Sequence, residues 1–387
     1  MRSAVWLLLA AALGAQDWPQ FLGPTRDGVY AGTAPSGVGA VVWKKEVGQG
    51  FAGPVVAQGK LILFHRVGNR ETVECLDAKT GKRIWSYDYP TSYRDDFGFD
   101  EGPRSVPTVA GGRVYTYGAE GALHCVDLAT GKKVWSVETR VKKGFFGAAG
   151  SPLVEGDRVL LNVAGIVAYH KDTGKVTWTA TQDEASYSSG VAVTAGGERH
   201  ALFLTRAGLV DLEPASGKVR FQLPWRSRSQ ASVNAATPVM VGENLVFVSA
   251  SYGTGAVLLE IPSQKKLWSS DDVLSCHYST PVFLEGRLYG FHGRQEEGQS
   301  LRCVEAKTGK VAWSEDGFGA GTVTLAGDRL VVVRENGEVV VAPASPAGFK
   351  PSGRAKVLSG TVRAYPALAD GRLYARSEKT LVCVRLQ

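Results

Sequence analysis

The chain of 387 residues carries 44 basic and 37 acidic side chains, a net charge of +7, and 44% of its residues are hydrophobic. This composition excludes an intrinsically disordered chain, because enough apolar side chains are present to build a large core. The basic excess is small and scattered, so we do not expect nucleic acid as a partner. The 47 glycines and 9 tryptophans are typical of many short strands joined by tight turns.

The first residues have the pattern of an export signal. Met1-Arg2 gives a short positive start, Val5 to Leu13 form a compact apolar run, and small residues follow. We predict a signal peptide over residues 1–16, cleaved near residues 14–16, and a periplasmic or secreted mature chain; a buried N-terminal strand is the alternative. The apolar run is too short to cross a bilayer, so no transmembrane segment is expected. No cysteine precedes Cys75, which leaves none near the cleavage zone to carry a lipid anchor.

After a lead-in at residues 17–37, one repeat runs through residues 38–387. Each copy contains a Thr-Gly-Lys turn or a variant, and a large apolar residue follows four positions after the glycine or its substitute. These apolar residues are Trp85, Trp135, Trp178, Phe221, Trp268, Trp313 and Val357, the last with the weak turn Ser352-Gly353. The mean step of about 45 residues is that of a four-stranded propeller blade. We predict that the aromatic members pack between neighbouring blades.

Three further signals define the strands of one unit. Asp77 and Asp127 precede the first two turns, and we expect their carboxylates to accept backbone N–H groups of those turns. Two-residue turns such as Gly111-Gly112 predict tight hairpins. A proline marks the start of the innermost strand in six units: Pro54, Pro107, Pro152, Pro238, Pro281 and Pro366.

The two ends of the repeat complete each other. Val41 to Lys44, which includes Trp43, reads as an outer strand with no unit before it, whereas the last unit ends at residues 381–384 without an outer strand. Pairing the two makes eight blades and removes the exposed sheet edges. The sequence therefore predicts an all-β fold, an eight-bladed propeller of four-stranded antiparallel blades closed by its N-terminal strand.

Four of the five cysteines occupy one equivalent position in four repeats, namely Cys75, Cys125, Cys303 and Cys383. Equivalent atoms of neighbouring blades are expected to lie too far apart for a disulfide. We interpret these four as small buried hydrophobic residues. Cys276 stands alone in a loop and is the candidate free thiol.

The pattern Asp-x-x-Thr-Gly-Lys-x-x-Trp resembles the tryptophan-docking motif of the PQQ-like, or quinoprotein alcohol dehydrogenase-like, β-propellers, over residues 38 to 387. The segment from Asp17 to Gly28 is similar to the lead-in of exported members. The family includes quinone-dependent alcohol dehydrogenases and the lipoprotein scaffold of the outer-membrane β-barrel assembly machinery. The resemblance thus implies either a redox enzyme or a scaffold.

The residues that carry the redox chemistry in that family are missing from this sequence. The resemblance to its methanol-oxidising members implies adjacent cysteines beneath the quinone and a bound Ca²⁺, but this chain has no Cys-Cys pair and no Cys-x-x-Cys-His haem motif. Asp95-Asp96, Asp100-Glu101 and Asp271-Asp272 are dense acidic groups that we expect to be solvated loop charge. Neither Gly-x-Ser-x-Gly nor His-Glu-x-x-His occurs. We expect no cofactor, with PQQ and Ca²⁺ as the alternative.

The loops that enter the innermost strands are rich in aromatic and basic residues, and rigid blades would place them around the mouth of the central channel. The candidate binding residues there are Arg104, Tyr187, Ser188, Arg226, His277, Tyr278, Arg363 and Tyr365. Arginine and aromatic groups that converge on a hollow can stack on and pair with a planar anion, or bind a peptide. The alternative is that these side chains plug the channel.

Three functions remain open on the sequence. The first is an exported, non-catalytic propeller that presents its loops to a protein partner or a small planar or anionic ligand. The second is a quinone- or metal-dependent oxidoreductase. The third is a propeller that cleaves sugars or polyphenols, for which Arg104, Tyr187, His277 and Tyr278 are the suggestive residues.

Overall fold

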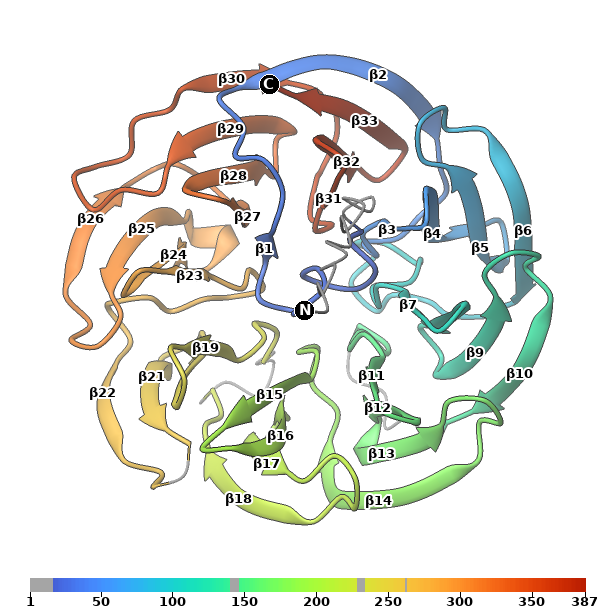
Figure 1. Ribbon diagram of the computed structural model, residues 1–387, viewed down its shortest axis with the longest axis horizontal. Helices are drawn as coiled ribbons and strands as arrows, with labels where there is room; N and C mark the ends of the chain where they lie inside the picture. Colours follow the sequence, from blue (N-terminus) through green and yellow to red (C-terminus); the bar gives the residue numbers. More distant parts are fainter. Residues whose placement is uncertain (1–16, 140–145, 228–233, 262) are drawn as a thin grey trace, which may run out of the picture.

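The computed structural model describes residues 17–139, 146–227, 234–261 and 263–387, so the predicted signal peptide lies outside the described residues. Eight antiparallel sheets of four strands surround a central axis (Figure 1). The predicted eight-bladed all-β propeller is confirmed. Within the described ranges there is no helix with the length and hydrophobicity needed to cross a membrane.

Each blade runs from an inner strand at the axis to an outer strand at the rim. The first four blades are β3 (Val55–Ala57), β4 (Lys60–Val67), β5 (Arg70–Asp77) and β6 (Arg83–Pro90); β7 (Thr108–Ala110), β8 (Arg113–Tyr117), β9 (Ala122–Asp127) and β10 (Lys133–Glu138); β11 (Leu153–Glu155), β12 (Arg158–Asn162), β13 (Ala164–His170) and β14 (Val176–Glu184); β15 (Val191–Ala195), β16 (Glu198–Leu204), β17 (Gly208–Leu212) and β18 (Val219–Pro224).

The other four blades follow in chain order. They are β19 (Val239–Val241), β20 (Leu245–Ala250), β21 (Gly255–Glu260) and β22 (Lys266–Ser270); β23 (Val282–Leu284), β24 (Arg287–His292), β25 (Ser300–Glu305) and β26 (Val311–Glu315), with the 3₁₀ turn η1 (Gln295–Glu297); β27 (Gly321–Ala326), β28 (Arg329–Arg334), β29 (Glu338–Pro343) and β30 (Gly353–Lys356); β31 (Ala367–Ala369), β32 (Arg372–Arg376), β33 (Thr380–Leu386) and β2 (Val38–Glu46).

The eighth blade is built from both ends of the chain. Strand β2 pairs antiparallel with β33 and places Trp43 opposite Cys383, so the blue and red ribbons lie side by side in Figure 1. This pairing gives the last blade its fourth strand and closes the ring. The predicted closure is therefore confirmed.

The glycines of the turns are required by backbone geometry and by the docking of the tryptophans. The indole Nε1 of Trp85 donates to the carbonyl of Leu128 in the next blade at 3.0 Å. Gly131, at φ +70°, lies against the same indole, and a Cβ there would be 2.6 Å from the ring. The tryptophans of five other outer strands donate in the same way: Trp43 to Ala78 (3.1 Å), Trp135 to Lys171 (2.9 Å), Trp178 to Pro214 (3.2 Å), Trp268 to Ala306 (2.8 Å) and Trp313 to Ser345 (2.7 Å).

The joint between the fourth and fifth blades departs from this pattern on both sides. The outer strand β18 carries Phe221, which is buried but has no N–H to donate. In the following blade Gln264 takes the position of the turn glycine and adopts φ +58°. The indole and the glycine are thus both replaced at the same joint between two blades.

The turn aspartates are bonded to the backbone of their turns. The carboxylate of Asp77 accepts from the Thr80 N–H and hydroxyl, both at 2.8 Å. Asp127 accepts in the same way from the N–H of Thr130 at 3.0 Å. These hydrogen bonds, first of all those from the threonine hydroxyls, lower the pKa of both aspartates.

The prediction of a turn at Ser352-Gly353 is wrong. Gly353 begins strand β30, and the connection from β29 to β30 is a longer loop than in the other blades. Trp313 packs on Phe349 of that loop, with 5.7 Å between ring centroids. Because the loop is longer, a glycine four residues before Val357 falls inside the strand and not in the turn.

The five cysteines are buried and free. Cys75, Cys125, Cys303 and Cys383 each lie opposite the tryptophan of the neighbouring strand in their blade. At this position each of the four cysteines is fully buried and packs as a small hydrophobic residue. Cys276 is fully buried as well, and burial raises its pKa to about 12, so the thiol is not ionised at neutral pH.

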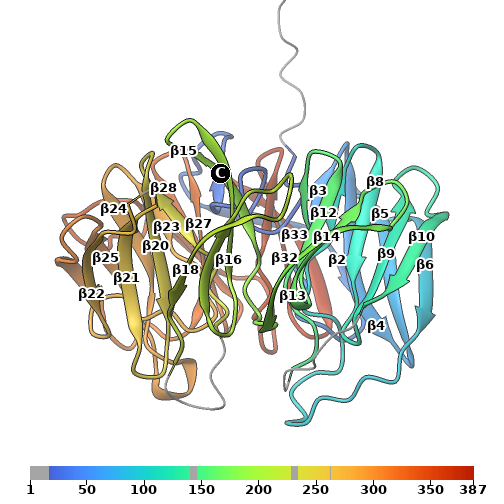
Figure 2. The same cartoon turned by 90° about the horizontal axis from the view of Figure 1, so that it is seen from below.

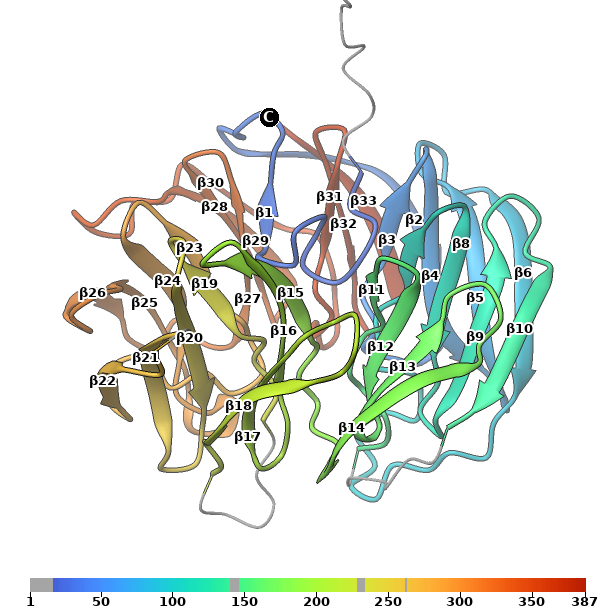
Figure 3. The same cartoon turned by 60° about the horizontal axis from the view of Figure 1, so that its bottom comes forward.

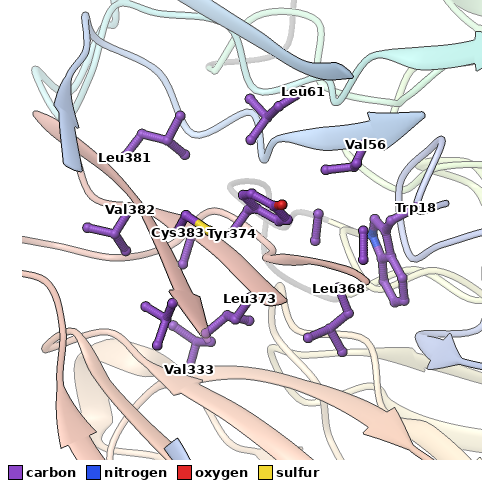
Figure 4. Packing of buried hydrophobic residues seen from close by; sticks show 14 of the residues in the cluster. Trp18, Val56, Leu61, Val333, Leu368, Leu373, Tyr374, Leu381, Val382 and Cys383 are labelled. Carbon is purple, nitrogen blue, oxygen red and sulfur yellow. The ribbon is translucent and has the colours of Figure 1, made fainter. Parts of the chain in front are cut away.

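The lead-in lies over one end of the ring (Figure 3). Its strand β1 (Val29–Tyr30) adds to the inner edge of β27 as a fifth, parallel strand. Trp18 bridges to Val56 of the first blade, and Figure 4 shows its indole packed in the core shared by the first and last blades. The lead-in therefore ties the seventh blade to the first and last blades.

Arg26 is the innermost polar residue of the lead-in. Its guanidinium is 2% exposed and donates to the carbonyls of Gly190 (2.9 Å) and Pro152 and to the hydroxyl of Thr108 (3.2 Å). No carboxylate among the described residues pairs with it, and burial lowers its pKa to about 9. Carbonyls that precede the inner strands of the third and fourth blades thus hold this buried arginine at the lead-in end of the channel.

Candidate functional site: the channel mouth

The opposite end of the axis is hollow. The connections from each outer strand to the next inner strand lie on this face, where the loop between β6 and β7 projects furthest (Figure 2). Together they surround a pocket of about 570 Å³. Its size is within the range that holds a small organic ligand.

The structure brings six of the eight predicted binding residues into this pocket: Arg104, Tyr187, His277, Tyr278, Arg363 and Tyr365. Ser188 lies beside it but is 2% exposed, and its hydroxyl donates to the carbonyl of Ala236 at 3.0 Å. The exposed side chain of Arg226 lies outside the pocket, because the preceding Trp225 is held away from the axis by its bond to the Gly255 carbonyl.

Arginines and phenylalanines alternate along one wall of the pocket. The guanidinium carbon of Arg104 lies 5.6 Å from the ring centroid of Phe51 and 5.5 Å from that of Phe146. Arg363 lies 5.6 Å from Phe51 and 5.5 Å from Phe99. Phe51 is thus contacted by both cations. Such cation–π contacts hold the guanidinium planes against the rings.

A buried carboxylate shapes the longest loop of the mouth. Asp95 is buried, accepts from the N–H groups of Phe97 (3.0 Å) and Phe99 (3.1 Å), and pairs with Arg104 at 3.0 Å. Asp100 is also buried and accepts from the N–H of Gly50 at 3.1 Å. The prediction that these two aspartates are solvated loop charge is wrong, because each one replaces water with backbone N–H donors.

The same loop carries two phenylalanines at its tip. Phe97 and Phe99 are each 54% exposed, and the Phe97 ring lies 5.2 Å from that of Phe146. Exposed aromatic pairs at the edge of a pocket are typical of binding surfaces.

Two polar atoms in the pocket wall have no hydrogen-bond partner among the described residues. One is the hydroxyl of Tyr278, and the other is Nδ1 of His277. The His277 Nε2 lies 3.1 Å from the hydroxyl of Tyr252. Burial raises the pKa of Tyr278 and lowers that of His277, so both are neutral at pH 7.

The acidic groups of the pocket are both paired. The Nε of Arg363 donates to Glu335 at 2.5 Å, and that of Arg294 donates to Glu296 at 2.7 Å. Arg294 in turn lies 4.5 Å from the ring centroid of Tyr252. Neither carboxylate therefore adds an unbalanced negative charge to the pocket.

Several lining residues were not predicted from the sequence: Phe21, Phe51, Phe99, Tyr252 and Glu335. Phe51 precedes an inner strand, as the predicted residues do, and could have been found by that criterion. Tyr252 and Glu335 lie between the second and third strands of a blade, a turn that reaches the same face. Phe21 comes from the lead-in, packs edge-on against Tyr365 at 5.0 Å, and has no counterpart in the repeat.

Comparison with protein families gives one match along almost the whole described chain. A family model described as outer membrane protein assembly factor BamB matches residues 21–95, 69–315 and 297–385. No curated protein sequence matches the chain.

Solved structures with the same fold include scaffold and redox proteins. BamB from Moraxella catarrhalis has a TM-score of 0.69 at 16% identity, covering 90% of this chain and 98% of that one. A europium-containing methanol dehydrogenase has a TM-score of 0.76 at 11% identity, covering 96% and 98%. A quinohemoprotein alcohol dehydrogenase from Comamonas testosteroni has a TM-score of 0.69 at 15% identity, covering 95% and 80%. At these identities the likeness shows the fold alone.

The residues of the mouth do not fit a quinone with a bound Ca²⁺. Its two carboxylates, Glu296 and Glu335, are each neutralised by an arginine. Across the part of the chain that the structure describes, no three His, Cys, Asp or Glu side chains lie close enough together to hold a metal ion. The sequence also lacks the adjacent cysteines that would support the quinone ring.

Proposed function

Because the chain belongs to the PQQ-like β-propeller family whose model is described as outer membrane protein assembly factor BamB, we propose that it is an exported, non-catalytic binding protein. Its binding face is the open mouth of the channel, and its ligand is a small planar or anionic molecule. Export to the periplasm or the medium rests on the signal pattern of residues 1–16.

One observation carries the proposal: a pocket opens at the end of the channel that the lead-in does not occupy. The lead-in with Arg26 occupies one end, whereas the other holds a 570 Å³ pocket of aromatic and arginine side chains. Side chains that served only to plug the axis would leave no such space.

A protein partner is the second candidate, and the exposed Phe97 and Phe99 favour it. Two rings that are 54% exposed at the tip of an ordered loop can insert into a groove of another protein. The description of the family model as an assembly factor is in keeping with such a contact. A partner of this kind would bind across the mouth, so both candidates use the same face.

The test is capture of small molecules from an extract of the cells that make the protein. The protein is equilibrated with the extract, washed and analysed by mass spectrometry. Ala149→Trp places a large ring in the pocket that Ala149 lines, and Ala215→Trp adds the same ring at an exposed turn outside it. We expect the wild type and Ala215→Trp to retain the same compound unchanged, and Ala149→Trp to lose it.

Two results would contradict the proposal. Retention by Ala149→Trp would place the ligand elsewhere. Conversion of the compound, or dye-linked alcohol oxidation after addition of PQQ and Ca²⁺, would make the protein an enzyme.

A further inference from the structure

We propose that the mouth is built for an aromatic monocarboxylate, with the carboxylate held by Arg363 and Tyr278 and the ring held against Phe51 and Phe99. This inference rests on the proposed function and names the ligand class of the same pocket.

Arg363 has N–H donors that the described residues do not use. Its side chain is 23% exposed and its Nε is used by Glu335, while Nη1 and Nη2 have no hydrogen-bond partner among the described residues. The two stacked rings, Phe51 and Phe99, fix the guanidinium plane. A guanidinium held in one plane with two free N–H edges is preorganised for the two oxygens of a carboxylate.

The hydroxyl of Tyr278 is a second polar group of the pocket wall without a hydrogen bond to the described residues. It is buried without a partner, and it lines the pocket together with Arg363. Buried hydroxyl groups are rarely left without a hydrogen bond in folded proteins, because the loss of water is unfavourable. A ligand that accepts from both Tyr278 and Arg363 would supply the missing partner. Nδ1 of the adjacent His277 also makes no hydrogen bond to the described residues and lies 3.9 Å from the Glu296 carboxylate.

The apolar walls define the rest of the ligand. Phe21 and Tyr365 meet edge to face at 5.0 Å, and both line the pocket with Phe51, Phe99 and Phe146. Flat walls of this kind favour a planar aromatic body, which packs by offset or edge-on contacts. The neutralised Glu335 and Glu296 add no charge that would select a cation instead.

The experiment is a calorimetric titration with 2-naphthoate and with its neutral analogue 2-naphthalenemethanol. We expect the carboxylate to bind about tenfold or more tightly than the alcohol, as a hydrogen-bonded charge pair would give. Tyr278→Phe should weaken naphthoate binding by about tenfold and leave the thermal midpoint unchanged or higher, since it removes an orphaned hydroxyl. Arg363→Gln should abolish the preference for the carboxylate.

Glu335→Gln gives the sharpest outcome because it acts in the opposite direction. It removes the carboxylate that competes for Arg363, so naphthoate should bind several-fold more tightly while the alcohol binds as before. Arg226→Gln is the matched control, since Arg226 is an exposed arginine outside the pocket, and it should change neither affinity.

Equal affinities for the acid and the alcohol, or weaker naphthoate binding by Glu335→Gln, would overturn the inference. If naphthoate fails to bind but Ala149→Trp still abolishes capture of a cellular compound, the ligand class is wrong and the proposed function stands. If the protein binds neither naphthoate nor a cellular compound, both the ligand class and the proposed function are wrong.

Discussion

Two glycines of the second blade allow the docking of a tryptophan to be separated from backbone strain. Gly131 and Gly112 have nearly equal backbone angles, φ +70° and +73°. A Cβ at Gly131 would lie 2.6 Å from the Trp85 ring, whereas a Cβ at Gly112 would meet nothing within 4 Å. The substitutions Gly131→Ala and Gly112→Ala thus share the strain and differ in the clash.

The expected difference follows from the contact. Alanine in the left-handed region costs about 1–2 kcal/mol at either site. At Gly131 the indole must also move, which adds about 1–3 kcal/mol of overpacking and about 1 kcal/mol for its hydrogen bond to Leu128. Gly131→Ala should therefore be about 2–4 kcal/mol less stable than Gly112→Ala. For a chain of this length the unfolding entropy is about 0.8 kcal/mol/K, so the thermal midpoints should differ by about 4 °C.

The assay is thermal unfolding followed by tryptophan fluorescence and by circular dichroism. Equal midpoints for the two variants would show that the indole does not need the glycine, and would refute this explanation of the motif. A third variant adds Trp85→Phe to Gly131→Ala, which imitates the joint where Phe221 and Gln264 occur. It should recover part of the lost stability.

Three further outcomes are expected. Arg26→Met leaves main-chain carbonyls at the axis without donors and should lower the unfolding free energy by about 3 kcal/mol. Arg26→Lys should recover less than half of this loss, because one ammonium group cannot reach all of those acceptors. Denaturant titration measures the unfolding free energy of both variants. Burial lowers the pKa of His124 from 6.5 to about 4, so its imidazole is neutral in the fold. The free energy of unfolding should therefore be unaffected by this group above pH 6.5 and should fall as the pH drops toward 4. His124→Gln should remove about 1.4 kcal/mol per pH unit from this fall, and an unchanged pH dependence of stability would contradict the prediction. The mature protein from the medium or periplasm should have the mass of a chain cleaved near residues 14–16, and an intact N-terminus there would refute the export signal.

The architecture could be predicted because the sequence repeat has the same spacing as the structural contacts within each blade joint. Each turn glycine needs a positive φ and contacts an indole, so the spacing between glycine and tryptophan is the same wherever the joint is the same. The position of Trp43 ahead of the first complete unit was enough to predict the closure with β33. The prediction failed at Ser352-Gly353, because the longer loop there places the glycine in strand β30 and not in a turn beside a tryptophan.

The pocket could be predicted only in part. Six predicted residues meet there because the loops between blades converge on one face. Asp95 was misread, since an acidic pair in a loop looks the same in the sequence whether water or backbone N–H groups surround it. Phe21 could not be predicted, because the lead-in has no repeat and its position depends on contacts with distant blades.

The claim that the open mouth is the binding face is tested most directly by a crystal structure of the protein grown with saturating 2-naphthoate. We expect electron density for the naphthalene ring beside Phe51, with its carboxylate within hydrogen-bond distance of Arg363. A mouth that contains only water, with naphthoate bound at the lead-in face or nowhere, would contradict it.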